Sequence, residues 1–177
     1  MSTQLRGQDD MKTTTLTRCA LLAAMALIIH IIEGYIPPIV PIPGIKVGFA
    51  NIITLSAMFV LGRRESFLIL VVRIILGSFF AGQAMSLLYS LSGGMLCFAV
   101  TACLKNYFGN GTMWVLGVIG AIMHSIGQIA CACAIFGSLS FLYYGAVMCA
   151  LSCVSGTFTG ICSLLLVRRL TSLWGGK

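Results

Sequence analysis

Between Ser66 and Val167 this sequence has only two charged side chains, Arg73 and Lys105. A soluble domain carries roughly 25% charged residues, so a long stretch this poor in charge cannot cover a surface that faces water. The whole chain follows the same pattern, with 8% charged and 59% hydrophobic residues. The sequence therefore predicts an all-α, polytopic integral membrane protein.

Six apolar segments separated by short turns predict six transmembrane helices. A helix needs about 20 residues to cross a ~30 Å hydrocarbon core, and the second and third segments are shorter than this. The expected spans are residues 16–36, 48–61, 66–80, 84–104, 112–136 and 141–167. They form one domain over 16–170, between a polar, mobile tail at 1–15 and a short tail at 171–177.

The placement of basic residues predicts how the chain is oriented. With six spans, nine Lys and Arg residues fall on the side of the two termini, and Lys46 falls alone on the other side. Basic residues of polytopic proteins collect on cytoplasmic loops. We therefore expect both termini in the cytoplasm. The net charge of +7 then reflects membrane topology and not a nucleic-acid partner.

The connection between the first two spans holds all the prolines of the sequence, which are Pro37, Pro38, Pro41 and Pro43. Proline fixes φ and lacks a backbone N–H, so this segment cannot continue a helix. The chain crosses it in a stiff extended form and re-enters the membrane through Gly44 and Gly48. Such a connection favours a lid over an extracytoplasmic site, and a plain spacer is the alternative.

Polar residues inside the expected spans predict the substrate-binding site. An Arg at the centre of a membrane helix costs about 2.5–3.5 kcal/mol on insertion scales, so such residues are rare and often functional. The candidates, with Lys46 of the loop, are Arg73, Glu33, Asn51, His124, Gln128 and His30. Arg73 and Lys46 could receive an anionic group, because a guanidinium binds carboxylate or phosphate through two N–H groups. The alternative is a structural Glu33–Arg73 ion pair with His124 hydrogen-bonded across helices.

The acidic residues are too few for a catalytic metal site. Asp9 and Asp10 lie in the tail, and Glu33 and Glu65 fall on opposite sides of the membrane. A magnesium diphosphate site built from carboxylates therefore cannot be assembled. The eight cysteines contain no CxxC pair and are interpreted as packing residues. We expect a chain that is not an enzyme and that uses no metal and no cofactor.

Small residues at four-residue spacing recur on three expected spans. Such rows let membrane helices approach closely. Gly117 and Ala121 form one row, Ala20 and Ala24 another, and the last span holds Ser152, Gly156 and Gly160. Packing within the monomer is the default interpretation of these rows, and a surface for a partner subunit is the alternative.

Four segments carry a resemblance to a known membrane family. They are PGIKVGFANIITL (43–55), RIILGSFFAG (73–82), SLSGG (90–94) and GAIMHSIGQ (120–128). Together they resemble the Gx transporter family, also catalogued as heptaprenyl diphosphate synthase component I. This family is similar to the substrate-binding S components of energy-coupling-factor (ECF) vitamin transporters. The similarity covers about residues 17–170.

The resemblance implies a six-helix fold in the cytoplasmic membrane of a prokaryote. The loop after the first helix would close over an extracytoplasmic substrate site, and Ala20 and Ala24 would contact a coupling subunit. The family's loop motif matches Pro43, Gly44, Lys46, Gly48 and Asn51. Its membrane arginine matches Arg73, and its His-x-x-x-Gln pair matches His124 and Gln128.

Two functions remain open on this basis. The first is a solute-binding transport protein for a flavin, a vitamin or an isoprenoid phosphate, driven by an ATPase pair on other chains. The second is a non-catalytic membrane subunit that associates with a soluble heptaprenyl diphosphate synthase. A solitary carrier is a third possibility.

Overall fold

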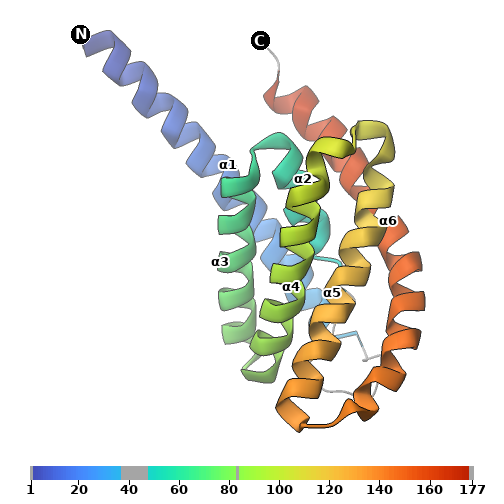
Figure 1. The fold of residues 1–177 in the computed structure, drawn as a ribbon. Coiled ribbons are helices and arrows are strands. Elements are labelled where there is room, and N and C mark those ends of the chain that lie inside the picture. Colours follow the sequence, from blue (N-terminus) through green and yellow to red (C-terminus); the bar gives the residue numbers. More distant parts are fainter. Residues whose placement is uncertain (1, 37–47, 83, 176–177) are drawn as a thin grey trace.

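The computed structural model describes residues 2–36, 48–82 and 84–175, with the side chains of 2–11, 81 and 110 left out. These residues form a bundle of helices with both termini at the same end (Figure 1). The α-helices are α1 (Ser2–Gly34), α2 (Asn51–Val60), α3 (Arg63–Ala81), α4 (Ala84–Leu104), α5 (Met113–Phe136) and α6 (Leu142–Trp174). Three short 3₁₀ turns lie in the connections, η1 (Lys105–Tyr107), η2 (Asn110–Thr112) and η3 (Leu139–Phe141). The predicted all-helical fold class is confirmed.

The helices differ in how much of a membrane they can cross. α1, α4, α5 and α6 are long and apolar enough to span it, which makes the chain a multi-pass membrane protein. α3 has 19 residues but begins with Arg63, Arg64 and Glu65. α2 has only 10 residues, which is about 15 Å at 1.5 Å per residue and half of a ~30 Å core. The short span expected at 48–61 therefore forms as a still shorter helix, which crosses about half of that distance.

The first and last helices extend further than the sequence predicts. The backbone of α1 is helical from Ser2, so the expected mobile tail at 1–15 instead continues the first helix beyond the bundle (Figure 1). No proline interrupts residues 2–34, so nothing there prevents the helix from continuing. At the other terminus α6 runs to Trp174, and Arg18 Nη2 donates to Trp174 O over 3.4 Å.

Two glycines end helices at the bundle end that lies away from the termini. Gly82 follows α3 and Gly137 follows α5, and both have a φ of 61°. This left-handed conformation strains any residue with a Cβ, so glycine is the usual residue just past a helix end. The two turns reverse the chain, so that α4 and α6 return towards the end that holds the termini (Figure 1).

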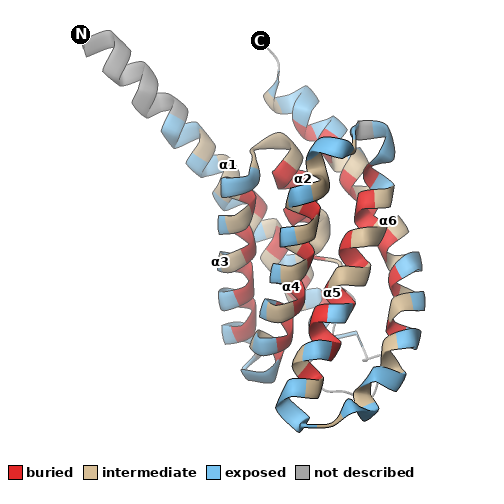
Figure 2. Ribbon diagram, viewed as in Figure 1, coloured by how far each residue is buried: buried red, intermediate tan, exposed pale blue. Residues whose placement is uncertain are grey.

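Glycines also let α5 and α6 pack with their backbones close together. A Cβ built on Gly117 would stand 2.5 Å from Gly160 Cα, and one on Gly156 would stand 2.6 Å from Val118 Cα. One turn away, Ser125 Oγ and Ser152 Oγ share a hydrogen bond of 2.6 Å. The rows of small residues on these two helices therefore pack within the monomer, as predicted. Figure 2 shows the buried residues as stripes along the inward faces of the helices.

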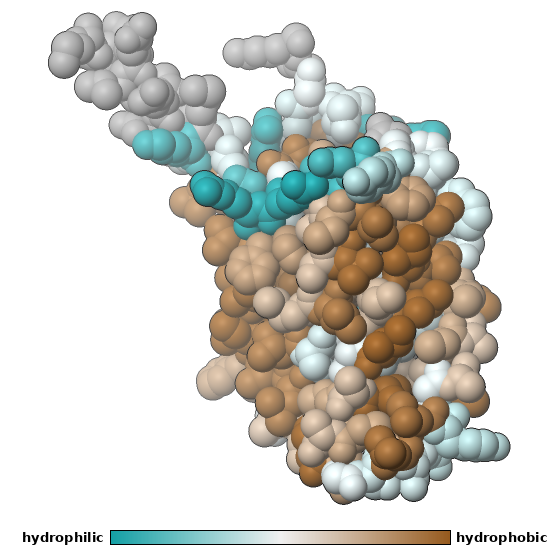
Figure 3. All heavy atoms as spheres, viewed as in Figure 1, coloured by the Kyte–Doolittle hydropathy of each residue, from teal (hydrophilic) through white to brown (hydrophobic). Residues whose placement is uncertain are grey.

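Basic side chains gather at the end of the bundle that holds the termini. Arg63 Nη2 donates to Asn106 Oδ1 over 3.1 Å, and Lys105 Nζ donates to Met58 O over 2.5 Å. Figure 3 shows a hydrophilic band at this end and a mainly apolar surface below it. Exposed apolar side chains such as Phe79 (80% exposed) and Val154 (73% exposed) suit contact with lipid.

Candidate functional site

The candidate site lies where α2 begins, near the middle of the membrane. α2 and α3 are joined by a turn at Gly62, which belongs to the charged end of the bundle. Asn51 and Arg73 are each eleven residues from Gly62. Because a helix rises 1.5 Å per residue, both lie roughly 15 Å from the turn, about halfway through a ~30 Å core.

A side-chain hydrogen bond at this depth joins α2 to α3. Arg73 Nη2 donates to Asn51 Oδ1 over 2.9 Å, and the arginine side chain is only 3% exposed. Its Nε has no hydrogen-bond partner among the described residues. A buried donor without a partner costs about 1–3 kcal/mol. Arg73 therefore keeps a donor that an acceptor on a ligand could satisfy.

The chain reaches Asn51 through Gly48, which is fixed from α1. The backbone N–H of Gly48 donates to Glu33 Oε1. Gly48 has a φ of 90°, and a Cβ built on it would stand 2.9 Å from Asn51 Nδ2 and 3.2 Å from His124 Cδ2. Only glycine combines this backbone conformation with so close an approach. Glu33 and Gly48 thus set where α2 starts.

Two histidines border the same region from α1 and α5. On α5, Gln128 Nε2 and His124 Nε2 are 3.0 Å apart, and both side chains are buried. Because the amide nitrogen can only donate, the imidazole accepts at Nε2. On α1, His30 packs against Gly77 of α3, where a Cβ would stand 2.3 Å from His30 Cδ2. Glycine at position 77 therefore makes room for the His30 ring.

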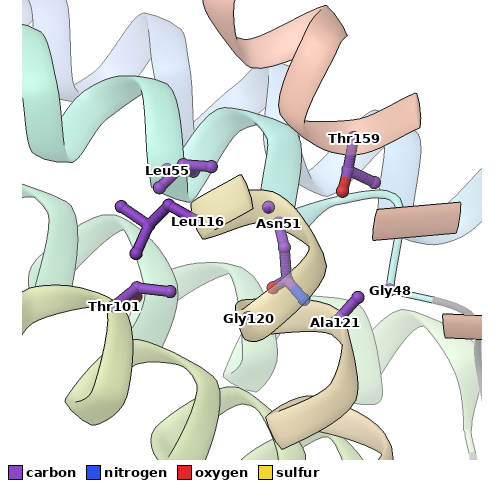
Figure 4. Close-up of a pocket in the computed structure, with 9 residues that line it drawn as sticks. Gly48, Asn51, Leu55, Thr101, Leu116, Gly120, Ala121 and Thr159 are labelled. Carbon is purple, nitrogen blue, oxygen red and sulfur yellow. The ribbon is translucent and has the colours of Figure 1, made fainter. Parts of the chain in front are cut away.

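These residues surround two small pockets that meet at Gly48. The polar pocket is lined by His30, Glu33, Gly48, Arg73, Ser90 and His124. The second pocket, here called the chamber, lies between α2, α4, α5 and α6 and includes Asn51, Leu55, Thr101, Leu116, Ala121 and Thr159 (Figure 4). Each leaves room for roughly one water molecule. A larger solute would enter only if the surrounding segments shifted.

The structure brings together most of the residues that the sequence singled out. His30, Glu33 and Arg73 line one pocket with His124, while Asn51 and Gln128 are hydrogen-bonded to members of that group. Ala20 and Ala24 lie apart from it, on the exposed face of α1. The remaining candidates fall outside the described residues, and they are Lys46 and the lid residues Pro37, Pro38, Pro41, Pro43 and Gly44.

Two further residues border the site, although the sequence analysis did not select them as candidates. Ser90 lines the polar pocket. Gly93 lets α4 and α5 meet beside His124, because a Cβ on it would stand 2.7 Å from His124 O. Both belong to the SLSGG run at 90–94, which was the only signal that could have indicated them.

Comparison with known protein families shows which family this chain belongs to. A family model described as heptaprenyl diphosphate synthase component I matches residues 22–166. The chain belongs to this family. The match includes every described site residue from His30 to Gln128, and it confirms the family that the motifs indicated. No match was found among curated proteins or among solved structures.

Proposed function

We propose that this member of the family is a membrane solute-binding component for transport, of the kind found as S components in ECF transporters. The observation that carries the proposal is Arg73. It is a buried cation at mid-depth, its Nε lacks a partner among the described residues, and it lines a pocket with other polar side chains. A purely structural arginine would be expected to use all its donors within the protein.

The ligand that fits this site is a small organic solute with an anionic group. A carboxylate or phosphate oxygen would satisfy Arg73 Nε, and the fork of the guanidinium favours such groups. Ser90 and His124 line the same pocket and offer further polar contacts. A phosphorylated flavin such as FMN or FAD, a vitamin that carries a carboxylate, or an isoprenoid phosphate meets this description.

We further propose that the solute enters from the extracytoplasmic side of a prokaryotic cytoplasmic membrane. The basic residues Arg63, Lys105 and Arg168 lie at the end that holds both termini, which supports a cytoplasmic position for that end. Ser90 is in the half of α4 that lies away from this end. Energy would come from an ATPase pair on other chains, through a coupling subunit that contacts the exposed face of Ala20 and Ala24.

We also propose that the chain is not itself a catalyst. Glu65 is in the first turn of α3, eight residues before Arg73, whereas Glu33 lies beside the Arg73 pocket. Eight residues of α3 place Glu65 about 12 Å along the helix axis from Arg73, and therefore far from Glu33. The two carboxylates are therefore too far apart to bridge a metal-bound diphosphate.

A second candidate function follows from the family's description. In it the chain is a non-catalytic membrane subunit that associates with a soluble heptaprenyl diphosphate synthase. Purification from the native host separates the two functions. An ATPase pair and a coupling subunit that co-purify with the chain would favour transport, and a prenyl synthase would favour the second function.

Ligand binding by the detergent-purified protein is the direct test. A ligand that binds only the folded state raises the free energy of unfolding by about 2.7 kcal/mol at a hundredfold excess over Kd. We would measure thermal shifts with riboflavin, FMN, FAD, other vitamins and short isoprenoid diphosphates. The proposal expects one solute class to shift the wild type and the control Arg63→Gln but not Arg73→Gln. An equal shift in Arg73→Gln would overturn the assigned site.

A further inference from the structure

The chamber is a second cavity that the proposed anion site does not use. Leu55, Leu116 and Thr101 lie together on one side of it, and Asn51 and Gly48 lie on the other (Figure 4). Thr159 of α6 completes the wall. One side of the chamber, at Gly48 and Asn51, therefore lies next to the polar pocket. The other side is formed by side chains of α2, α4 and α5.

The hydroxyls of the two threonines that line the chamber are already hydrogen-bonded within their own helices. Thr101 Oγ1 donates to Cys97 O over 2.7 Å, and Thr159 Oγ1 donates to Gly156 O over 3.0 Å. Both hydroxyls are therefore satisfied by their own helices. Gly117 and Gly120 add two positions without a side chain. The side of the chamber formed by Leu55, Leu116 and the Thr101 methyl group is therefore apolar.

The polar pocket and the chamber adjoin through two residues. Gly48 borders both, and Asn51 in the chamber accepts the hydrogen bond of Arg73 in the polar pocket. A displacement of Gly48 would join the two spaces, and the surrounding segments would have to shift further to admit an organic solute. The joined cavity would have Arg73, next to the Glu33 carboxylate, at one end and apolar side chains at the other.

From this arrangement we infer that the ligand is an amphipathic organic anion, held by both spaces at once. Its charged group binds Arg73 in the polar pocket, and its apolar part occupies the chamber. The inference rests on the proposed function, because it assigns the ligand class of the same site. It excludes small, fully hydrophilic solutes as the preferred ligand, since they would leave the apolar walls without a partner.

The test compares ligands that share a charged group but differ in their apolar part. One pair is FMN and ribitol 5-phosphate, and the other is geranyl diphosphate and inorganic diphosphate. Affinities are measured by calorimetry on the full-length protein in detergent. The variant Arg73→Gln measures the background signal that arises when the amphipathic probes partition into detergent micelles. For at least one pair we expect the amphipathic member to bind wild type at least about tenfold more tightly.

Variants of the chamber wall then separate its role from that of Arg73. Thr159→Leu extends a side chain into the chamber, and Thr157→Leu is the control because it makes the same change on α6 at a residue that does not line the chamber. Gly120→Ala narrows the opposite wall, where the new Cβ would stand 2.9 Å from the Thr101 methyl. We expect Thr159→Leu and Gly120→Ala to remove the preference for the amphipathic member. Thr157→Leu should keep that preference.

Each contrary result has a distinct meaning. Equal affinities within both pairs, or an unchanged preference in both narrowed variants, would show that the chamber does not bind the apolar part of the ligand. Neither result would contradict the anion site at Arg73. Binding of no probe above the Arg73→Gln background would overturn the proposed function together with this inference. Thermal unfolding of each unliganded variant shows that it is folded. If Thr159→Leu fails to fold, Gly120→Ala decides the question.

Discussion

Asn51 and Arg73 are hydrogen-bonded at equal sequence distances from the Gly62 turn. Their contact of 2.9 Å fixes the register in which α2 packs on α3. It also places an amide and a guanidinium at the same depth, about halfway through the membrane. The site therefore depends on the short length of α2, because a full-length helix would carry Asn51 to the membrane surface.

The Asn51–Arg73 contact should appear as an energetic coupling. Asn51→Ala leaves the Arg73 guanidinium with one fewer partner, and we expect it to lower the free energy of unfolding by about 1–3 kcal/mol. Arg73→Met removes the buried charge. Because the two residues share one hydrogen bond, the double variant should lose less than the sum of the single changes, by about 0.5–3 kcal/mol.

Reversible unfolding in mixed micelles measures this coupling. The pair Arg63→Met and Asn51→Ala is the control, since Arg63 donates to Asn106 and does not reach Asn51. Additive losses for Asn51 and Arg73, as in the control pair, would show that the contact contributes nothing to stability.

The sequence predicted the polar members of the site because such residues are costly inside a membrane. Arg73, Glu33 and His124 stand out in an apolar chain, and the structure places them around one pocket. Ser90 and Gly93 gave no such signal, because small residues are common in membrane helices. Their role becomes clear only when α4 is seen against α5.

The errors in the predicted helices have related causes. An apolar run such as 48–61 shows that residues are buried, but it does not show where within the membrane a helix starts. Gly48 delays the start of α2 to Asn51 through its positive φ. Conversely, the polar residues 2–15 looked like a tail, although hydrophilic residues form a helix readily when a stable helix follows them.

Replacing Gly160 should weaken the packing of α6 on α5. A Cβ at position 160 would stand 2.5 Å from Trp114 Cα, a backbone atom that cannot move aside alone. We expect Gly160→Ala to lower the free energy of unfolding by about 1–3 kcal/mol through overpacking. Gly109→Ala is the matched control, because no atom lies within 4 Å of its new Cβ. Similar stability of the two variants in detergent would contradict the close helix contact.

Lys105 should make stability depend on pH at the alkaline end of the range. Burial, followed by the nearby charge of Arg63, lowers the pKa of Lys105 below its usual value of 10.5. The unfolded chain then holds this proton more tightly than the folded one. Between the lowered pKa and 10.5, the free energy of unfolding should therefore rise with pH through this group. Lys105→Met should remove that contribution.

The measurement is the difference in unfolding free energy between wild type and Lys105→Met at several pH values. Subtracting the two curves cancels the titration of all other groups that are unaffected by the change. A difference that grows in favour of wild type as pH approaches 10.5 is expected. A constant difference would mean that Lys105 acts only through its hydrogen bond to Met58 O, which holds the last turn of α2.

Labelling of single cysteines should report which end of the bundle faces the cytoplasm. In a variant without the eight native cysteines, Tyr107→Cys marks the end that holds the termini and Leu139→Cys marks the opposite end. Both native side chains are exposed, at 83% and 74%, so neither change removes core packing. In intact cells a membrane-impermeant maleimide should label position 139 alone, and it should label position 107 only after the membrane is opened. The reverse pattern would place the termini outside. Labelling of both positions in intact cells would mean that α5 does not cross the membrane.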